Sequence, residues 1–147
     1  MVALKEPHPN ELVGTWRLIS IEDFGPNNKI TYPMGKNVTG YLMYDFNGNM
    51  AQQIMDKARP KVSLKEATRP QLDEIIAGFD AYSGTYSVNY KEGSITYIVE
   101  CSIYPSLIGN ELKRQFKIND ELIIQSSYKN NQDNTQHLRV VKWKKVN

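Results

Sequence analysis

Apolar and polar residues alternate along most of the chain, a pattern typical of β-strands that bury one face. The runs that follow it predict strands at residues 11–24, 38–46, 49–55, 82–90, 94–104, 111–118, 121–128 and 136–145. A shorter segment at residues 31–35 contains Pro33, which restricts it to a sheet edge or a loop. Asn47-Gly48, whose residues both tolerate positive φ, is the clearest hairpin signal.

One segment, between residues 56 and 80, departs from this alternation. Four apolar residues recur there at helical spacing, namely Leu72, Ile75, Ile76 and Phe79. Ser63-x-x-Glu66 and Thr68-x-x-Gln71 both fit a capping box, and Pro70 suits a first helical turn. The apolar stripe covers about two turns, too few for a stable isolated helix. We therefore expect this helix to pack on the surrounding β structure.

Consecutive hairpins predict an antiparallel meander, and long strands of this kind close because closure removes exposed edges. The predicted fold class is all-β, a single antiparallel up-and-down barrel of about eight strands that could hold one small ligand. The short helix would cap one mouth or pack on the wall. A two-sheet sandwich has the same alternation and stays an alternative. Residues 1–10, with two prolines, are predicted to be a flexible N-terminal arm and residues 11–147 the barrel domain.

Composition narrows the class of protein. A chain of 147 residues with 40% apolar and 23% charged residues fits one globular domain. The chain shows neither a signal-peptide-like start nor an apolar run of membrane-spanning length, so we expect a cytoplasmic protein without a membrane partner. Cys101 is the single cysteine, which fits that compartment and is typical of a small buried apolar residue. A net charge of +2 with scattered basic residues does not favour a nucleic-acid partner.

The densest set of polar and aromatic residues lies at residues 81–116. Glu100 interrupts a strand-forming run there, and Arg114 follows on the next predicted strand. In one arrangement both point into the barrel and form a two-hydrogen-bond ion pair, because a buried carboxylate needs a partner. In the other arrangement the more apolar face of residues 95–103 points inward and Glu100 faces water. Both arrangements stay open from the sequence.

Tyrosines suit a pocket for a mixed ligand, because each has an apolar ring and a polar hydroxyl. The predicted ligand-binding residues are Tyr44, Gln53, Tyr82, Tyr86, Tyr97, Tyr104, Glu100 and Arg114. His8 and His137 lie near opposite chain ends, and no cluster of metal-ligating residue types has ligand spacing. A nucleophilic serine elbow and a glycine-rich phosphate loop are also missing from the sequence. We therefore predict neither a metal nor a cofactor.

Several motifs carry a family resemblance. Gly14-Thr15-Trp16 is similar to the Gly-x-Trp of lipocalins and other calycins. The motifs LVGTWRLIS, YP-x-G-x-x-x-TGYLMY, NGNMAQQIM, AYSGTYSV and VE-x-S-x-x-P-x-x-x-G-x-x-x-x-R-x-F, followed by Trp143, resemble the bacterial and fungal lipocalin-like domain family. The resemblance runs from about Leu12 to Trp143.

What the resemblance implies is a small calycin-type barrel with a central cavity. Trp16 would close one end beneath a basic side chain of the last strand, and both Trp16 and Trp143 would be structural. The candidates for that basic side chain are Arg139, Lys142 and Lys144. The residues often shared in the family fall on Trp16, Gly40, Tyr82, Ser83, Gly84, Tyr86, Glu100, Pro105, Gly109, Arg114 and Trp143. Tyr97 and Ile98 stand where many members carry two histidines, so chemistry that depends on an imidazole there is not carried over.

Three functions stay open. The first is a binding protein that holds a small hydrophobic or aromatic molecule in the cavity. Some members of the family resemble accessory proteins or cyclase-like enzymes of secondary metabolism. These members suggest the second function, which is a non-hydrolytic isomerase or cyclase. In it Glu100 would act as general acid or base, and Arg114 would tune the pKa of Glu100. The third is a barrel with a filled core that acts through its surface.

Overall fold

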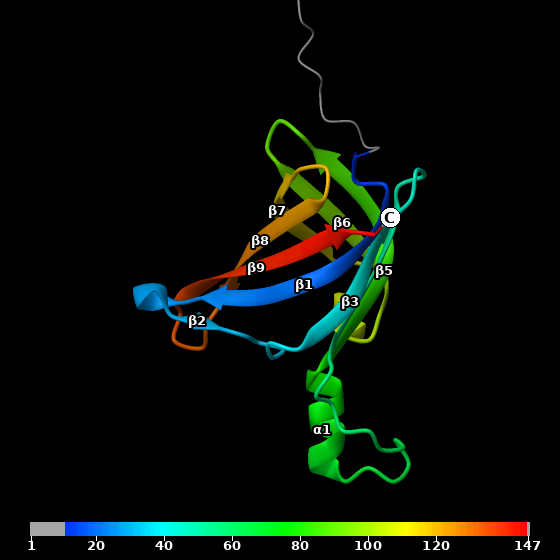
Figure 1. Ribbon diagram of the computed structural model, residues 1–147, viewed down its shortest axis with the longest axis vertical. Coiled ribbons are helices and arrows are strands. Elements are labelled where there is room, and N and C mark those ends of the chain that lie inside the picture. Colours follow the sequence, from blue (N-terminus) through cyan, green and yellow to red (C-terminus); the bar gives the residue numbers. More distant parts are fainter. Residues whose placement is uncertain (1–10, 147) are drawn as a thin grey trace, which may run out of the picture.

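The computed structural model describes residues 11–146, whose strands form a closed antiparallel barrel (Figure 1). Eight strands of this described part form the barrel wall: β1 (Gly14–Phe24), β3 (Val38–Tyr44), β4 (Asn49–Asp56), β5 (Phe79–Asn89), β6 (Ser94–Ser102), β7 (Glu111–Ile118), β8 (Leu122–Asn130) and β9 (Gln136–Lys145). Each pairs with the next along the chain, and β1 also pairs with β9, which closes the wall. The predicted fold class is confirmed. The two-residue strand β2 (Ile30–Thr31) pairs with the end of β1.

Side-chain hydrogen bonds explain why the chain turns where it does. Between β3 and β4 the Asp45 carboxylate accepts from the backbone N–H of Asn47 at 2.9 Å and of Asn49 at 2.8 Å. Gly48 in the same turn has φ of +86°, a backbone conformation that favours glycine. Between β7 and β8 the Asn119 side chain accepts from the backbone N–H of Leu122 at 2.9 Å. Short polar turns of this kind fix the meander.

Two strands contain irregularities that redirect side chains. The register of β1 shifts between Leu18 and Ser20, and beyond the shift Ile21 joins Trp16 and Leu18 in the interior. Strict alternation would place Ile21 on the opposite face. In β5 the register shifts between Ser83 and Gly84. Such bulges increase strand curvature, which a small barrel needs.

The core fills much of the barrel interior. The buried apolar residues are Leu12, Trp16, Leu18, Ile21, Leu42, Tyr44, Met50, Ile54, Tyr82, Ile95, Tyr97, Val99, Ile123 and Trp143. Trp16 is fully buried, and its indole N–H donates to the Leu12 carbonyl at 2.9 Å. The Lys145 ammonium lies 4.9 Å from the Trp16 ring centroid. The last strand thus supplies a basic side chain as expected, but from Lys145 and not from the three residues that the sequence had suggested.

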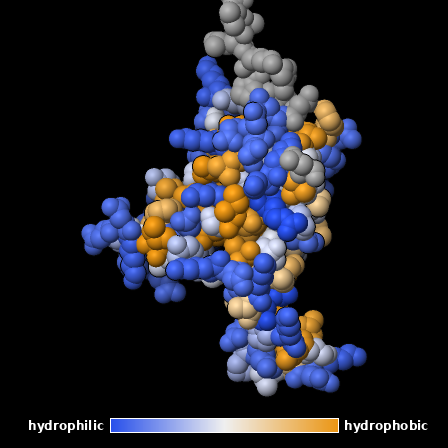
Figure 2. Space-filling model, viewed as in Figure 1, coloured by the Kyte–Doolittle hydropathy of each residue, from blue (hydrophilic) through white to orange (hydrophobic). Residues whose placement is uncertain are grey.

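The helix α1 (Arg69–Ala77) begins at the predicted capping box, in which the Gln71 N–H donates to the Thr68 hydroxyl. It extends away from the barrel beside the ends of β4 and β5, with hydrophobic side chains exposed on its surface (Figures 1 and 2). All nine of its residues are at least partly exposed, so the helix does not cap a mouth of the barrel or bury its apolar stripe on the wall as expected. Arg59 links it to the barrel, because its guanidinium donates to the Ile75 carbonyl at 3.2 Å and lies 5.0 Å from the Phe79 ring centroid.

Two 3-10 turns complete the described elements, η2 (Pro26–Asn28) and η3 (Pro105–Leu107). The expected N-terminal arm, residues 1–10, lies outside the described residues. Between residues 11 and 146, no helix is long and apolar enough to span a lipid bilayer.

Candidate functional site

A cavity of about 100 Å³ remains inside the barrel beside the filled core. Its walls come from β1, β4, β5, β7, β8 and β9, and from Pro33 and Met34 between β2 and β3. Its apolar lining is formed by Ile21, Met34, Ile54 and Val141, and its polar lining by Gln52, Asp80, Tyr82, Arg114, Gln125, Ser127, Lys129 and Arg139. The volume lies below the 300–1,000 Å³ or so that drug-sized ligands occupy. The space therefore suits a small molecule that has both an apolar and a polar side.

Gln125 is the centre of a buried hydrogen-bond network at the inner end of the cavity. Its amide N–H₂ donates to the Tyr97 hydroxyl at 2.7 Å and to the Tyr44 hydroxyl at 3.1 Å. Its amide oxygen accepts from the Trp143 indole N–H at 3.1 Å. The two tyrosine hydroxyls also bond to each other. Burial raises the pKa of Tyr44 and of Tyr97, so both stay neutral near pH 7.

A second buried pair, Gln52 and Tyr82, faces the cavity from β4 and β5, where the two residues are register partners. The Tyr82 hydroxyl donates to the Gln52 amide oxygen at 3.2 Å. Burial raises the pKa of Tyr82 well above its ordinary value, and the nearby Arg114 guanidinium opposes part of that rise. The cavity wall here is thus neutral and held by hydrogen bonds.

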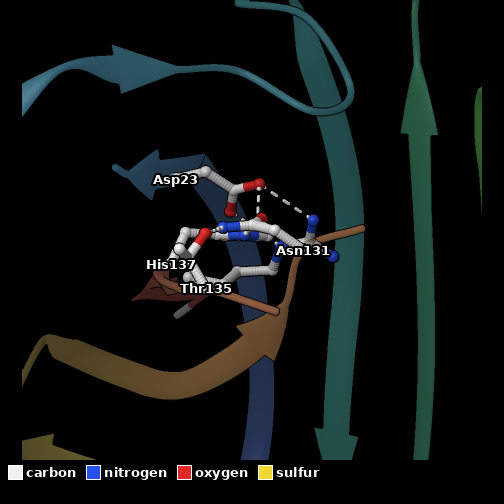
Figure 3. A network of polar contacts seen from close by, with 5 residues as sticks. Asp23, Asn131, Thr135 and His137 are labelled. Carbon is white, nitrogen blue, oxygen red and sulfur yellow. Dashed lines mark hydrogen bonds and ion pairs between the residues drawn. The ribbon is translucent and has the colours of Figure 1, made fainter. Parts of the chain in front are cut away.

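Arg139 is held in place by an ion pair at the rim of the barrel. Its guanidinium donates two hydrogen bonds to the Asp23 carboxylate, at 2.8 and 3.0 Å. His137 Nε2 lies 3.1 Å from Asp23 Oδ2 but outside hydrogen-bonding geometry, while its Nδ1 bonds to Asn131 Oδ1 at 2.6 Å (Figure 3). Asn131 in turn donates to the Thr135 hydroxyl at 2.8 Å. Asp23 and Arg139 therefore neutralise each other within a fixed network.

Three further charged residues line the cavity without such partners. Within residues 11–146, no carboxylate lies within 4.0 Å of the Arg114 guanidinium or the Lys129 ammonium. Burial and the nearby Arg114 and Arg139 charges lower the pKa of Lys129 to about 8. Burial raises the pKa of Asp80, whose buried Oδ1 has no hydrogen-bond partner in the described part of the chain.

The structure brings together some of the residues predicted from the sequence. Tyr82 and Arg114 line the cavity. Tyr44 and Tyr97 lie in the core, where their hydroxyls accept hydrogen bonds from the cavity residue Gln125. Tyr86 also points inward, with its ring centroid 4.7 Å from that of Tyr44.

Other predicted residues lie elsewhere. Tyr104 lies beside the helix and donates to the backbone carbonyls of Ile76 and Phe79, both at 3.3 Å. Gln53 is exposed on the outer face of β4, whereas its neighbour Gln52 is buried and lines the cavity. The expected position of Gln53 in the cavity is therefore wrong by one residue, because successive side chains of a strand point to opposite faces.

The expected interior pair of Glu100 and Arg114 is not formed. Glu100 is exposed on the outer face of β6, and Arg114 lies on the inner face of β7. The apolar alternative describes the strand correctly, since Tyr97 and Val99 are buried. Burying them gains more than burying a carboxylate, which would lose its hydration. Cys101 is also exposed, contrary to its expected burial.

The outward position of Glu100 gives a testable result. We expect Glu100→Gln to change the free energy of unfolding by less than about 0.5 kcal/mol, as is usual for an exposed residue. Ligand affinity should also stay unchanged, because the side chain does not line the cavity. Urea denaturation and ligand titration check both results. A loss of more than about 1 kcal/mol, or of ligand affinity, would contradict this placement.

Five polar cavity residues were assigned no role from the sequence, namely Gln52, Asp80, Gln125, Ser127 and Lys129. A signal for three of them was present, because alternation from the buried Ile123 places residues 125, 127 and 129 on the inner face. Their polar character made that face look solvent-exposed. Among the described residues, no group of three or more His, Cys, Asp or Glu is arranged to hold a metal ion.

Comparison with known proteins shows what this chain is similar to. The sequence profile of a family described as a lipocalin-like domain matches residues 13–146. A solved complex of bovine odorant binding protein with a selenium-containing odorant is 12% identical in sequence, with a TM-score of 0.49. The alignment covers 100% of this chain and 78% of that one. No curated protein matches the sequence.

Proposed function

Because the chain belongs to the lipocalin-like domain family, we propose that it binds a small organic molecule with an apolar or aromatic body inside its barrel. The cavity of about 100 Å³ is the observation that carries this proposal. A concave site with an apolar wall and a few convergent polar groups is the usual form of a small-molecule site.

The apolar and the polar lining of the cavity contact different parts of the ligand. The body of the ligand packs against Ile21, Ile54 and Val141, which gains free energy from the apolar area removed from water. The polar groups of the ligand replace water at the amides of Gln52 and Gln125. Because these amides are already held by buried tyrosines, binding costs little side-chain ordering.

The test is to fill the cavity from one strand. Ser127 lines it from β8, and the preceding Ser126 points to the opposite face. Protein purified from its own source is examined by native mass spectrometry, and any co-purified molecule is added back to ligand-free protein. If none co-purifies, a panel of single-ring aromatic compounds is titrated instead. We expect Ser127→Phe to lower the affinity at least tenfold, because the ring occupies the ligand's space.

Ser126→Phe is the matched control, since it adds the same ring to the same strand outside the cavity. It should leave the affinity within about twofold of the wild-type value, because the side chain at residue 126 lies on the face of β8 away from the cavity. Equal binding by both variants would contradict the proposal, and so would a chain to which neither a co-purified molecule nor any panel compound binds.

A further inference from the structure

The charges around the cavity do not cancel. Three cationic side chains, Arg114, Lys129 and Arg139, face it together with the carboxylate of Asp80. Arg139 is already neutralised by Asp23 at 2.8 Å. The two positive charges of Arg114 and Lys129 are then opposed by the single negative charge of Asp80. One positive charge at the cavity is therefore not balanced. A site with this charge balance attracts an anion of charge −1.

We propose that the cavity selects small organic monoanions, whose carboxylate is bound by Arg114 and Lys129 and whose far end donates a hydrogen bond to Asp80. This inference rests on the proposed function, since it names the chemical class of that ligand.

The strands place donors for a carboxylate close together. Ser126 pairs with Gln115 across β7 and β8, so the next inward-facing residues on these strands are Ser127 and Arg114. Lys129 follows Ser127 on the same face of β8. A guanidinium can give two parallel hydrogen bonds to a carboxylate, and a hydroxyl and an ammonium can add more. The Arg114 guanidinium donates to the carbonyl of Lys113 at 3.2 Å and lies near the Tyr82 hydroxyl, with no carboxylate partner in residues 11–146.

Asp80 supplies the opposite requirement. Its Oδ1 is buried and has no hydrogen-bond partner in residues 11–146. A buried oxygen without a donor costs free energy, so a hydroxyl or amine on the ligand that donates to it is favoured. An anion cannot take that place, since it would repel the carboxylate. The ligand class is thus a small acid that also carries a hydrogen-bond donor, and the cavity volume favours short or single-ring members.

The state of Lys129 predicts how binding depends on pH. The charged and titratable groups around it are Arg114 on β7, Arg139 and the register partner His137 on β9, Asp23 on β1 and Asp80 on β5. Its pKa of about 8 means that it loses its proton between about pH 7 and 9 in the empty protein. Anion affinity should fall across that range while Arg114 stays charged. Binding at pH 8 should take up protons, because a bound anion raises the pKa of Lys129.

The experiment compares benzoate, 4-hydroxybenzoate and neutral benzamide by isothermal titration calorimetry. We expect 4-hydroxybenzoate to bind best and benzamide weakest. Arg114→Met should lower benzoate affinity about 10- to 100-fold, the size of a lost charge-assisted hydrogen bond, and leave benzamide affinity within about twofold. Retained benzamide binding shows that the variant is folded. Asp80→Asn should remove the preference for 4-hydroxybenzoate over benzoate.

Lys113→Met is the charge-matched control, since it removes one positive charge from the exposed outer face of β7. It should change benzoate affinity by less than about twofold. Equal losses of benzoate affinity in Lys113→Met and Arg114→Met would overturn the proposal. So would benzamide binding as tightly as benzoate, or 4-hydroxybenzoate binding no better than benzoate.

The readouts separate this inference from the proposed function. If neutral compounds bind and Ser127→Phe blocks them while the Arg114 and Asp80 variants behave like the wild type, the barrel binds ligands but not this class. If Ser127→Phe has no effect on any compound that binds, the proposed function itself fails.

Discussion

Replacing Gly84 with alanine is expected to lower the free energy of unfolding by about 3–5 kcal/mol, a large share of the 5–15 kcal/mol that stabilises a typical domain. A Cβ atom at this position would lie 1.9 Å from the carbonyl oxygen of Ile98 and 3.1 Å from the backbone nitrogen of Glu100. Both neighbours are backbone atoms, which cannot move aside without breaking the pairing of β5 with β6. The bulge between Ser83 and Gly84 is where the two strands approach so closely.

Urea denaturation measures this loss, and Gly25→Ala is the control. At Gly25 an added Cβ would meet its nearest neighbour, the carbonyl oxygen of Lys29, at 3.7 Å. Its backbone φ of −96° suits any residue. The control should therefore stay within about 1 kcal/mol of the wild type. A Gly84→Ala protein of similar stability would show that β5 and β6 can separate without cost.

Gln125→Leu is expected to lower the free energy of unfolding by about 2–4 kcal/mol. The change keeps the volume of the side chain but removes the acceptor of the Trp143 indole N–H and the donor to two tyrosine hydroxyls. A buried donor without an acceptor costs about 1–3 kcal/mol. The tyrosines keep their bond to each other, so the orphaned indole should dominate the loss.

Gln53→Leu is the matched control, because it makes the same change on the outer face of β4, where it should cost less than about 0.5 kcal/mol. A second variant isolates the indole. Trp143→Phe removes the indole N–H, which Gln125→Leu leaves without an acceptor. The double variant should therefore lose less free energy of unfolding than the sum of the losses in the two single variants. Strict additivity of the two changes would show that this hydrogen bond contributes nothing to stability.

The strands and their order could be predicted from the sequence, because alternation and turn residues are local properties. The last strand, residues 136–145, and the Asn47-Gly48 hairpin need no tertiary information. Which face of each strand points inward is harder to predict, since a shift of one residue moves every side chain to the opposite face. The predicted cavity residue Gln53 and the observed Gln52 differ by such a shift, and the bulge after Leu18, which no residue type signals, turns Ile21 inward.

The candidate site was less predictable for a different reason. Its charges lie on an inner face where apolar residues are the norm, so Lys129 could be assigned to the interior only from the closed wall, whereas Arg114 was already a predicted ligand-binding residue. Glu100 illustrates the reverse error. Its place within a strand-forming run suggested burial, but Tyr97 and Val99 on the opposite face of the same strand are the residues buried in the core. The volume left inside the barrel depends on how these side chains pack, which no local pattern contains.

The closing of the barrel by its first and last strands also bears on how the chain folds. Trp16 on β1 pairs with Lys145 on β9, so the wall cannot close until the residues as far as Lys145 have left the ribosome. Contacts between such distant residues form slowly, because the entropy of closing a long loop is lost before the contact forms. Until then one edge of β1 stays unpaired and can recruit other extended chains. Synthesis rate and chaperone contact during this interval should therefore affect the yield of folded protein more than the stability of the finished barrel does.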